Sequence, residues 1–118
     1  NMANTFKQVS NDAMPSSAGT PLVLYTVPSS TTTVGLALYL CNMHTSAVTV
    51  SVQMTSGTSG GNPNTNSNVY IIKNVNLPVG STINALPNKI TLQTTDDILI
   101  DCSVSGKIDA SFSVMEIT

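Results

Sequence analysis

Charged side chains are scarce in this sequence. Only 8% of its 118 residues are Asp, Glu, Lys or Arg, against about 25% in an ordinary soluble domain. Arginine and tryptophan are absent, and the four lysines stand singly along the chain. Nucleic acids and anionic membrane surfaces are both bound through clustered basic side chains. We therefore expect neither nucleic acid nor membrane as a partner.

Long apolar runs and aromatic residues are also scarce. No stretch approaches the ~18 continuous apolar residues of a membrane-spanning helix. No basic region followed by an apolar one opens the chain, so we expect synthesis in the cytoplasm without an export signal. Aromatics make up 4% and hydrophobic residues 41%, so a core must be built mainly from Val, Ile, Leu and Met. Ser, Thr and Asn fill the polar positions, which suits a protein that is packed into an assembly or secreted.

Reactive side chains do not form a recognisable catalytic pattern. The single histidine, His44, falls in an expected turn, and no serine lies in a Gly-x-Ser-x-Gly elbow. Cys41, Met43 and His44 are soft metal ligands close in sequence, but the group lacks a fourth member. The aspartates near Asp96 and Asp97 lack the spacing of a calcium loop. We expect a non-enzymatic protein without catalytic residues, cofactor or metal.

The two cysteines, Cys41 and Cys102, both fall on expected strands and could bridge two sheets. Cys102 occupies the same alternate positions as Ile98 and Ile100 and should face the core with them, whereas Cys41 faces away from the neighbouring leucines. Reduced thiols are the default for a protein made in the cytoplasm. We therefore predict two buried free thiols rather than a disulfide.

Alternation of apolar and hydroxyl-bearing residues dominates the chain from residue 21 onward, which is the period of half-buried strands. In 47–55, for example, Val48, Val50, Val52 and Met54 alternate with Thr and Ser. Turn signals recur about every 8–12 residues, as in sandwiches and barrels. We predict an all-β protein, an antiparallel β-sandwich of about eight strands with jelly-roll or immunoglobulin-like topology. The expected strands are 22–27, 34–41, 47–55, 69–75, 81–86, 89–93, 98–104 and 108–117.

Two segments lack this alternation. Residues 1–20 carry few apolar side chains, and we interpret them as a flexible N-terminal arm before a sandwich domain at 21–118. Residues 55–68 are a long Gly/Ser/Asn loop, while Ser105-Gly106 fits a tight hairpin. We expect residues 1–20 and the 55–68 loop to contact partners. The candidate residues are Phe6, Lys7, Val9 and Met14 in the arm, and Asn62, Asn64 and Asn66 in the loop.

Several short stretches resemble small virion proteins of tailed bacteriophages, of the marine and cyanobacterial type. The resemblance spans nearly the whole chain outside 55–68, although each motif alone consists of residues that are common in strands and turns. The stretches are Met2-Ala3-Asn4-Thr5-Phe6-Lys7, Val23-Leu24-Tyr25-Thr26-Val27-Pro28 with the following Ser/Thr run and strand 34–41, Ile71-Ile72-Lys73-Asn74, Leu77-Pro78-Val79-Gly80-Ser81, Lys89-Ile90, and Ser113-Val114-Met115-Glu116-Ile117.

The resemblance implies a structural protein of the virion, most simply a capsid decoration or cement protein. Its partners would be capsid or other virion proteins and further copies of itself. A trimer would fit, because decoration proteins often gather at the threefold axes of the capsid lattice. Two alternatives stay open. One is a tail, neck or baseplate attachment module. The other is a carbohydrate- or cell-surface-binding module that uses the 55–68 loop.

Overall fold

The computed structural model describes residues 3–56 and 68–118, and over those residues it contains strands and turns but no helix. The prediction of an all-β protein is confirmed. Nine strands are present in the described residues, one more than expected. They are β1 (Asn4–Met14), β2 (Leu22–Thr26), β3 (Thr32–Asn42), β4 (Val48–Thr55), β5 (Asn68–Leu77), β6 (Thr82–Asn84), β7 (Ile90–Leu92), β8 (Asp97–Cys102) and β9 (Ile108–Ile117).

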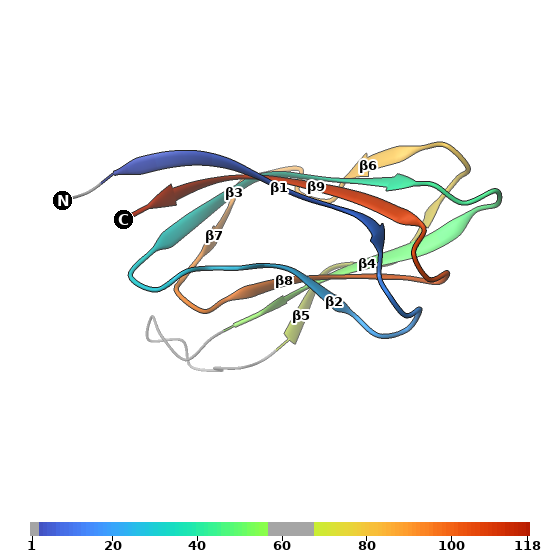
Figure 1. Ribbon diagram of the computed structural model, residues 1–118, viewed down its shortest axis with the longest axis horizontal. Helices are drawn as coiled ribbons and strands as arrows, with labels where there is room; N and C mark the ends of the chain where they lie inside the picture. Colours follow the sequence, from blue (N-terminus) through green and yellow to red (C-terminus); the bar gives the residue numbers. More distant parts are fainter. Residues whose placement is uncertain (1–2, 57–67) are drawn as a thin grey trace.

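The strands form two antiparallel sheets packed face to face (Figure 1). Sheet A has the order β1-β9-β3-β6, with β7 also paired to β3, and sheet B has the order β2-β8-β4-β5. The pairing is nested, because β1 pairs with β9, β2 with β8, β3 with β6 and β4 with β5. One long antiparallel ribbon rolled over itself gives this order, so the topology is a jelly roll rather than an immunoglobulin fold.

The core lies between the sheets and follows the predicted alternation. Ile108, Ala110, Phe112 and Val114 of β9 are all buried, and they belong to the same core cluster as Val48, Val50 and Val52 of β4. A one-residue slip of either strand would expose these side chains, so burial fixes the register.

A β-bulge interrupts the alternation in β3. The register against β9 shifts between Gly35 and Ala37, which changes the face on which odd-numbered residues lie. Leu38 and Leu40 are fully buried, whereas Leu36 lies at the bulge and is only half-buried. Strict alternation along 34–41 would place Leu36 on the same face as Leu38 and Leu40, and the bulge is the reason that this expectation is wrong for Leu36.

The prediction of a flexible arm is wrong for residues 4–14. These residues form β1, which pairs with β9 from Asn4 opposite Ile117 to Asn11 opposite Ala110. Backbone hydrogen bonds hold an edge strand without requiring apolar alternation, so a mostly polar segment is sufficient here. The sandwich accordingly includes these residues rather than beginning at residue 21.

Two predicted connections turn out differently. Ser105-Gly106 is not a hairpin, because it joins β8 of sheet B to β9 of sheet A. Gly106 nevertheless has the expected positive φ, +68°. Most of the 55–68 loop, including Asn62, Asn64 and Asn66, lies outside the described residues. Within 3–56 and 68–118 there is no helix of the length and apolarity needed to cross a membrane.

Candidate functional site

The outer face of sheet A carries an apolar row across three neighbouring strands. Phe6 of β1 lies opposite Met115 of β9, and Met115 lies opposite Val34 of β3. Phe6 is 73% exposed, while Met115 and Val34 are half-buried. Residues directly opposite each other in an antiparallel sheet lie on the same face with adjacent side chains. The row is therefore a continuous apolar strip that no other part of the described chain covers.

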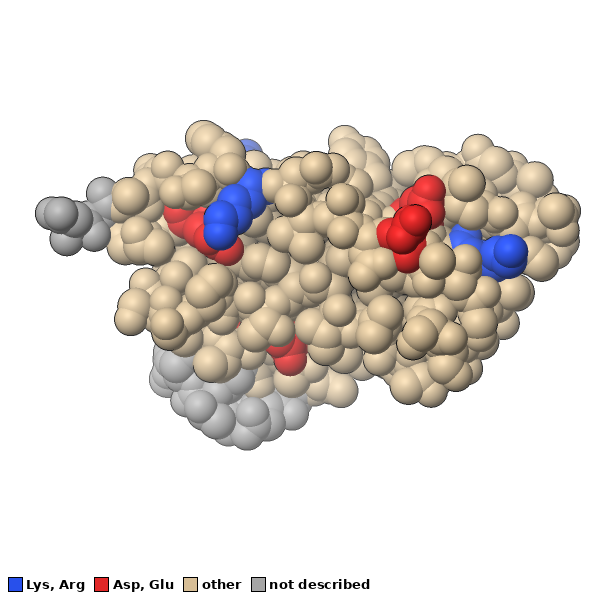
Figure 2. Space-filling model, in the orientation of Figure 1, with Lys and Arg blue, Asp and Glu red and all other residues tan. Residues whose placement is uncertain are grey.

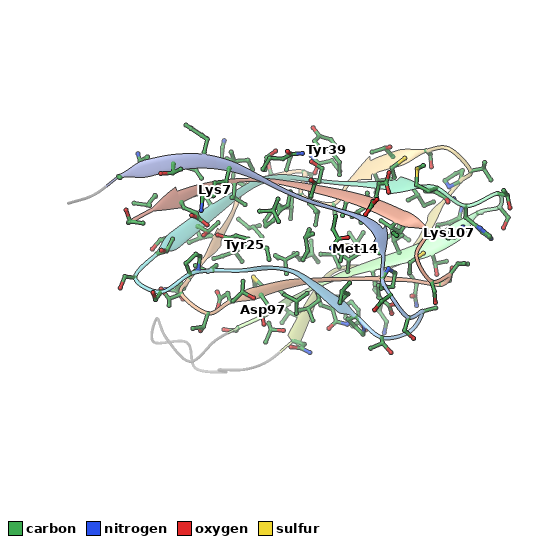
Figure 3. All side chains as sticks on the ribbon, viewed as in Figure 1. Lys7, Met14, Tyr25, Tyr39, Asp97 and Lys107 are labelled. Atoms are coloured by element: carbon green, nitrogen blue, oxygen red, sulfur yellow. The ribbon has the colours of Figure 1, made fainter. Side chains whose placement is uncertain are left out.

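A second group of apolar side chains extends this outer face along β3. Tyr39 is 48% exposed and Met43, just beyond the strand, is 56% exposed. Figure 3 shows Tyr39 projecting from sheet A on the side away from sheet B. Cys41 also lies on this face, opposite Asp109 of β9, with its Sγ 3.8 Å from the Met43 Sδ. Exposed apolar side chains that cluster in this way mark sites of protein contact more often than isolated ones do.

A polar network inside the sandwich holds β1 against the rest of the fold. The Lys7 Nζ lies 2.8 Å from the Glu116 Oε1, and Glu116 of β9 is only 5% exposed. The Tyr25 hydroxyl donates to the Glu116 Oε2 at 2.6 Å and lies 2.7 Å from the Thr33 Oγ1. In Figure 3, Lys7 and Tyr25 both point into the space between the sheets. The network thus links β1 and β9 of sheet A to β2 of sheet B.

The network shifts the acidity of two of its members. The hydrogen bond from Lys7, followed by the one from Tyr25, lowers the pKa of Glu116 below its ordinary value despite the opposing effect of burial. Burial, followed by the hydrogen bond to the Glu116 carboxylate, raises the pKa of Tyr25 to about 12. Glu116 is therefore a carboxylate and Tyr25 a neutral phenol at neutral pH, which is the pairing that the hydrogen bond requires.

Sequence reasoning missed this network, although a signal for it exists. Glu116 continues the inward series of Ile108, Ala110, Phe112 and Val114 on β9. A glutamate at an inward position needs partners, because a buried charge is costly unless it is paired and hydrogen-bonded. The same parity argument that located the core therefore points to Glu116.

The predicted contact residues of the N-terminal segment lie in different environments. Phe6 is exposed on the outer face, and Lys7 is half-exposed with its ammonium on Glu116. Val9 is half-buried and packs against the core. Met14 is fully buried, so the prediction that it contacts a partner is wrong. It follows the bulge at the end of β1, where the chain turns down into the core.

The two cysteines are free thiols on different sheets, Cys41 on β3 and Cys102 on β8. Cys102 is buried as predicted, but Cys41 is only half-buried because it faces outward. Beside Cys41 and Met43, the backbone N–H of His44 donates to the Asn42 Oδ1. Over the described ranges, no three His, Cys, Asp or Glu residues gather in a way that would hold a metal ion.

Two hollows on the surface are lined mainly by polar residues. One, of about 480 Å³, lies where β1 and β9 meet near the bulge and includes Asp12 and Asp109. The other, of about 200 Å³, lies on the outer face of sheet B and includes Ser51, Asn74 and Asp101. The Asp101 Oδ1 accepts hydrogen bonds from the backbone N–H of Gly19 and of Cys102, so this carboxylate is fixed in position.

Comparison with known proteins gives likeness of fold only. No protein-family model matches the chain, and no curated protein matches it by sequence. The chain is similar to a chain in the structure of infectious bursal disease virus, Gx strain, with a TM-score of 0.55 and 14% identity over 99% of this chain and 33% of the viral one. It also matches a chain from Bacillus endospore appendages, described as disulfide-linked pili, with a TM-score of 0.46 and 16% identity over 98% of this chain and 85% of that one. The chain thus spans about a third of the length of the viral chain, and the likeness to that viral chain is one of fold alone.

Proposed function

We propose that this chain is a non-enzymatic structural protein of a bacteriophage particle, a capsid decoration protein that binds the shell surface and adds contacts between shell subunits. The observation that carries the proposal is the uncovered apolar strip of Phe6, Met115 and Val34 on the outer face of sheet A. The sandwich likeness to a chain of a virus structure and the sequence resemblance described above support the same class. The chain would then be located in the virion.

Apolar contact on a charge-poor surface suits this role. Only 8% of the residues are charged, so two such surfaces approach with little electrostatic repulsion and little cost of charge desolvation. Each contact can be weak, because many copies on one lattice bind together and the avidity exceeds the affinity of a single site. The mechanism is therefore the burial of apolar surface without any chemical step.

The test is binding to purified expanded capsids of the phage whose genome carries the gene. We expect the chain to sediment with those capsids and to raise their melting temperature. Phe6→Ser should weaken binding about tenfold or more if Phe6 is an anchor of the interface. Val79→Ser is the matched control, because Val79 is 57% exposed but lies in the turn between β5 and β6. Equal loss in both variants, or no binding to capsids, would contradict the proposal.

A tail, neck or baseplate module is the alternative within the virion. Copurification with tails rather than capsids, or a gene placed among tail genes, would favour it. The hollow on the outer face of sheet B is the feature that favours a carbohydrate-binding module, because hydroxyl, amide and carboxylate groups of Ser51, Asn74 and Asp101 line it. Binding on a glycan array that is lost in Asp101→Asn would support that function.

A further inference from the structure

The four edges of the two sheets differ in how well they are protected against pairing with another strand. In sheet A, the edge strands β6 and β7 have only three residues each. In sheet B, β2 has five residues and a register shift between Val23 and Tyr25. β5 is longer, but its pairing with β4 shifts twice and Asn74 has a φ of +50°. Short strands and bulges are the usual devices that prevent edge-to-edge pairing.

β1 lacks these devices over most of its length. It pairs with β9 through eight consecutive residues, from Asn4 to Asn11, before any register shift occurs. Its only lysine, Lys7, is directed between the sheets, where its charge is already paired with Glu116. β1 is therefore the one long, regular and open edge among the strands of the described chain.

The hydrogen-bond pattern shows which backbone groups the open edge presents. Ala3 and Thr118 exchange both backbone hydrogen bonds, at 3.2 and 3.0 Å. Hydrogen-bonded and non-hydrogen-bonded pairs alternate along an antiparallel ladder. The even-numbered residues Asn4, Phe6, Gln8 and Ser10 accordingly direct their N–H and C=O groups away from β9, toward any strand placed alongside.

The charges on β1 favour an antiparallel copy of the same strand. The segment carries one cation, Lys7, in its first half and one anion, Asp12, in its second half. An antiparallel copy places each Asp12 beside the half that holds the other Lys7. Figure 2, which has the orientation of Figure 1, shows that most of this side of the molecule is uncharged, with basic and acidic side chains close together toward each end.

The register of such a pair follows from parity and charge. A twofold axis perpendicular to the sheet keeps both cores on the same side, so inward residues must lie opposite inward residues. Centring the axis on Lys7 would place two ammonium-bearing side chains directly opposite each other, which is unfavourable. Centring it on Val9 would bring the bulge at Ala13 into the paired region. Centring it on Gln8 avoids both problems and places Phe6 opposite Ser10 of the second copy.

We propose that two copies of this chain associate by antiparallel pairing of their β1 strands about Gln8, which joins the two A sheets into one continuous sheet. This inference rests on the proposed function, since it names the self-contact that an assembling subunit would use. A single strand pair covers less area than the ~800 Å² per partner of a standard interface. The dimer should therefore be weak in solution and strengthened on a lattice.

Disulfide trapping of the full chain tests the register. In a Cys41→Ser background, Gln8→Cys places two thiols on residues whose Cα atoms would lie about 5.5 Å apart, within disulfide reach. Ser10→Cys is the matched control on the same face and edge, with its two copies about 13 Å apart at ~3.3 Å per residue. Under mild oxidation we expect a covalent dimer from Gln8→Cys but not from Ser10→Cys. Equal cross-linking of both variants would overturn the register.

Sedimentation equilibrium tests the association itself, without capsids. We expect the unmodified chain to dimerise in the micromolar range and Gln8→Lys to weaken dimerisation about tenfold or more by like-charge repulsion at the axis. Ser113→Lys adds the same charge to the same face one strand further in, opposite Gln8, and should change dimerisation less than about twofold. Thermal melts establish that each variant folds.

The outcomes separate this inference from the proposed function. A chain that stays monomeric up to about 1 mM, or equal effects of Gln8→Lys and Ser113→Lys, would overturn the pairing. If that monomer still bound capsids, the proposed function would stand alone. If the chain dimerised as expected and did not bind capsids, the pairing would stand and the decoration function would fall.

Discussion

Replacing Tyr25 with phenylalanine isolates the hydrogen bonds that tie β2 to sheet A. The substitution removes only the hydroxyl, which donates to the Glu116 Oε2 at 2.6 Å and lies 2.7 Å from the Thr33 Oγ1. The ring remains and keeps its edge-on contact with Phe112, at 5.6 Å between centroids and an interplanar angle of 78°. Any loss of stability then reports on the polar network rather than on packing.

The expected loss follows from the type of hydrogen bond. A bond to a charged partner contributes about 1.5–3 kcal/mol, and Glu116 would keep Lys7 but lose one of its two partners in the buried site. We therefore expect Tyr25→Phe to lower the free energy of unfolding by about 2 kcal/mol. For a domain of 118 residues that corresponds to a fall in melting temperature of about 8 °C. Urea unfolding followed by circular dichroism measures it, with Tyr39→Phe as the exposed control.

The pH dependence gives a second and independent measure of the same network. Because the folded pKa of Glu116 is lowered, its contribution is present above the unfolded value near 4.5 and is lost as the pH falls through the folded value. Because the folded pKa of Tyr25 is raised from 10.0 to about 12, its contribution is present below pH 10 and is lost as the pH rises between those values. The stability difference between the unmodified chain and Tyr25→Phe should therefore narrow above pH 10. A difference under ~0.5 kcal/mol at pH 7, or one that does not change at high pH, would refute this reasoning.

Three further predictions concern packing, a buried amide and the thiols. Gly35→Ala should destabilise the fold by about 1–3 kcal/mol, because the added Cβ would lie 2.9 Å from the Ile90 Cγ1; chemical denaturation measures this. Asn42→Ala should cost about 2–4 kcal/mol, because the buried Nδ2 donates to three backbone carbonyls; an unchanged melting temperature would contradict it. Cys41 should react with a thiol reagent in the native protein, whereas Cys102 should react only after unfolding, as a spectrophotometric titration would show.

The sequence predicted the strands wherever side-chain burial alternates. The expected ranges 22–27, 47–55 and 108–117 match β2, β4 and β9 closely, because each has one face in the core and the other in solvent. β1 was missed for the same physical reason. Its neighbour β9 supplies a backbone ladder, so few of its residues need apolar side chains, and without alternation a strand has no signature in the sequence.

The pairing of the strands and the candidate site were harder to predict from the sequence than the strands themselves. Local alternation does not determine which strands pair, and the corner at Ser105-Gly106 has the residues of a hairpin although it crosses between sheets. The bulge at Leu36 changes the parity of β3 without any glycine or proline at the bulged position itself. Phe6 was identified as a contact residue from composition alone, but its alignment with Met115 and Val34 depends on pairings among three strands that lie far apart in the sequence.

The sequence of β3 has apolar residues on both faces, but a single chain covers only the inner face. Leu38 and Leu40 alternate with Ala37, Tyr39 and Cys41, a pattern typical of a strand covered on both faces. In the structure β3 is central in sheet A, and sheet B covers its inner face, yet Tyr39 remains 48% exposed on the outer one. Sequences generally agree with their folds at every level, and where they do not, the site is usually functional. Under the proposed function, a neighbouring subunit would cover this outer face in the assembled particle.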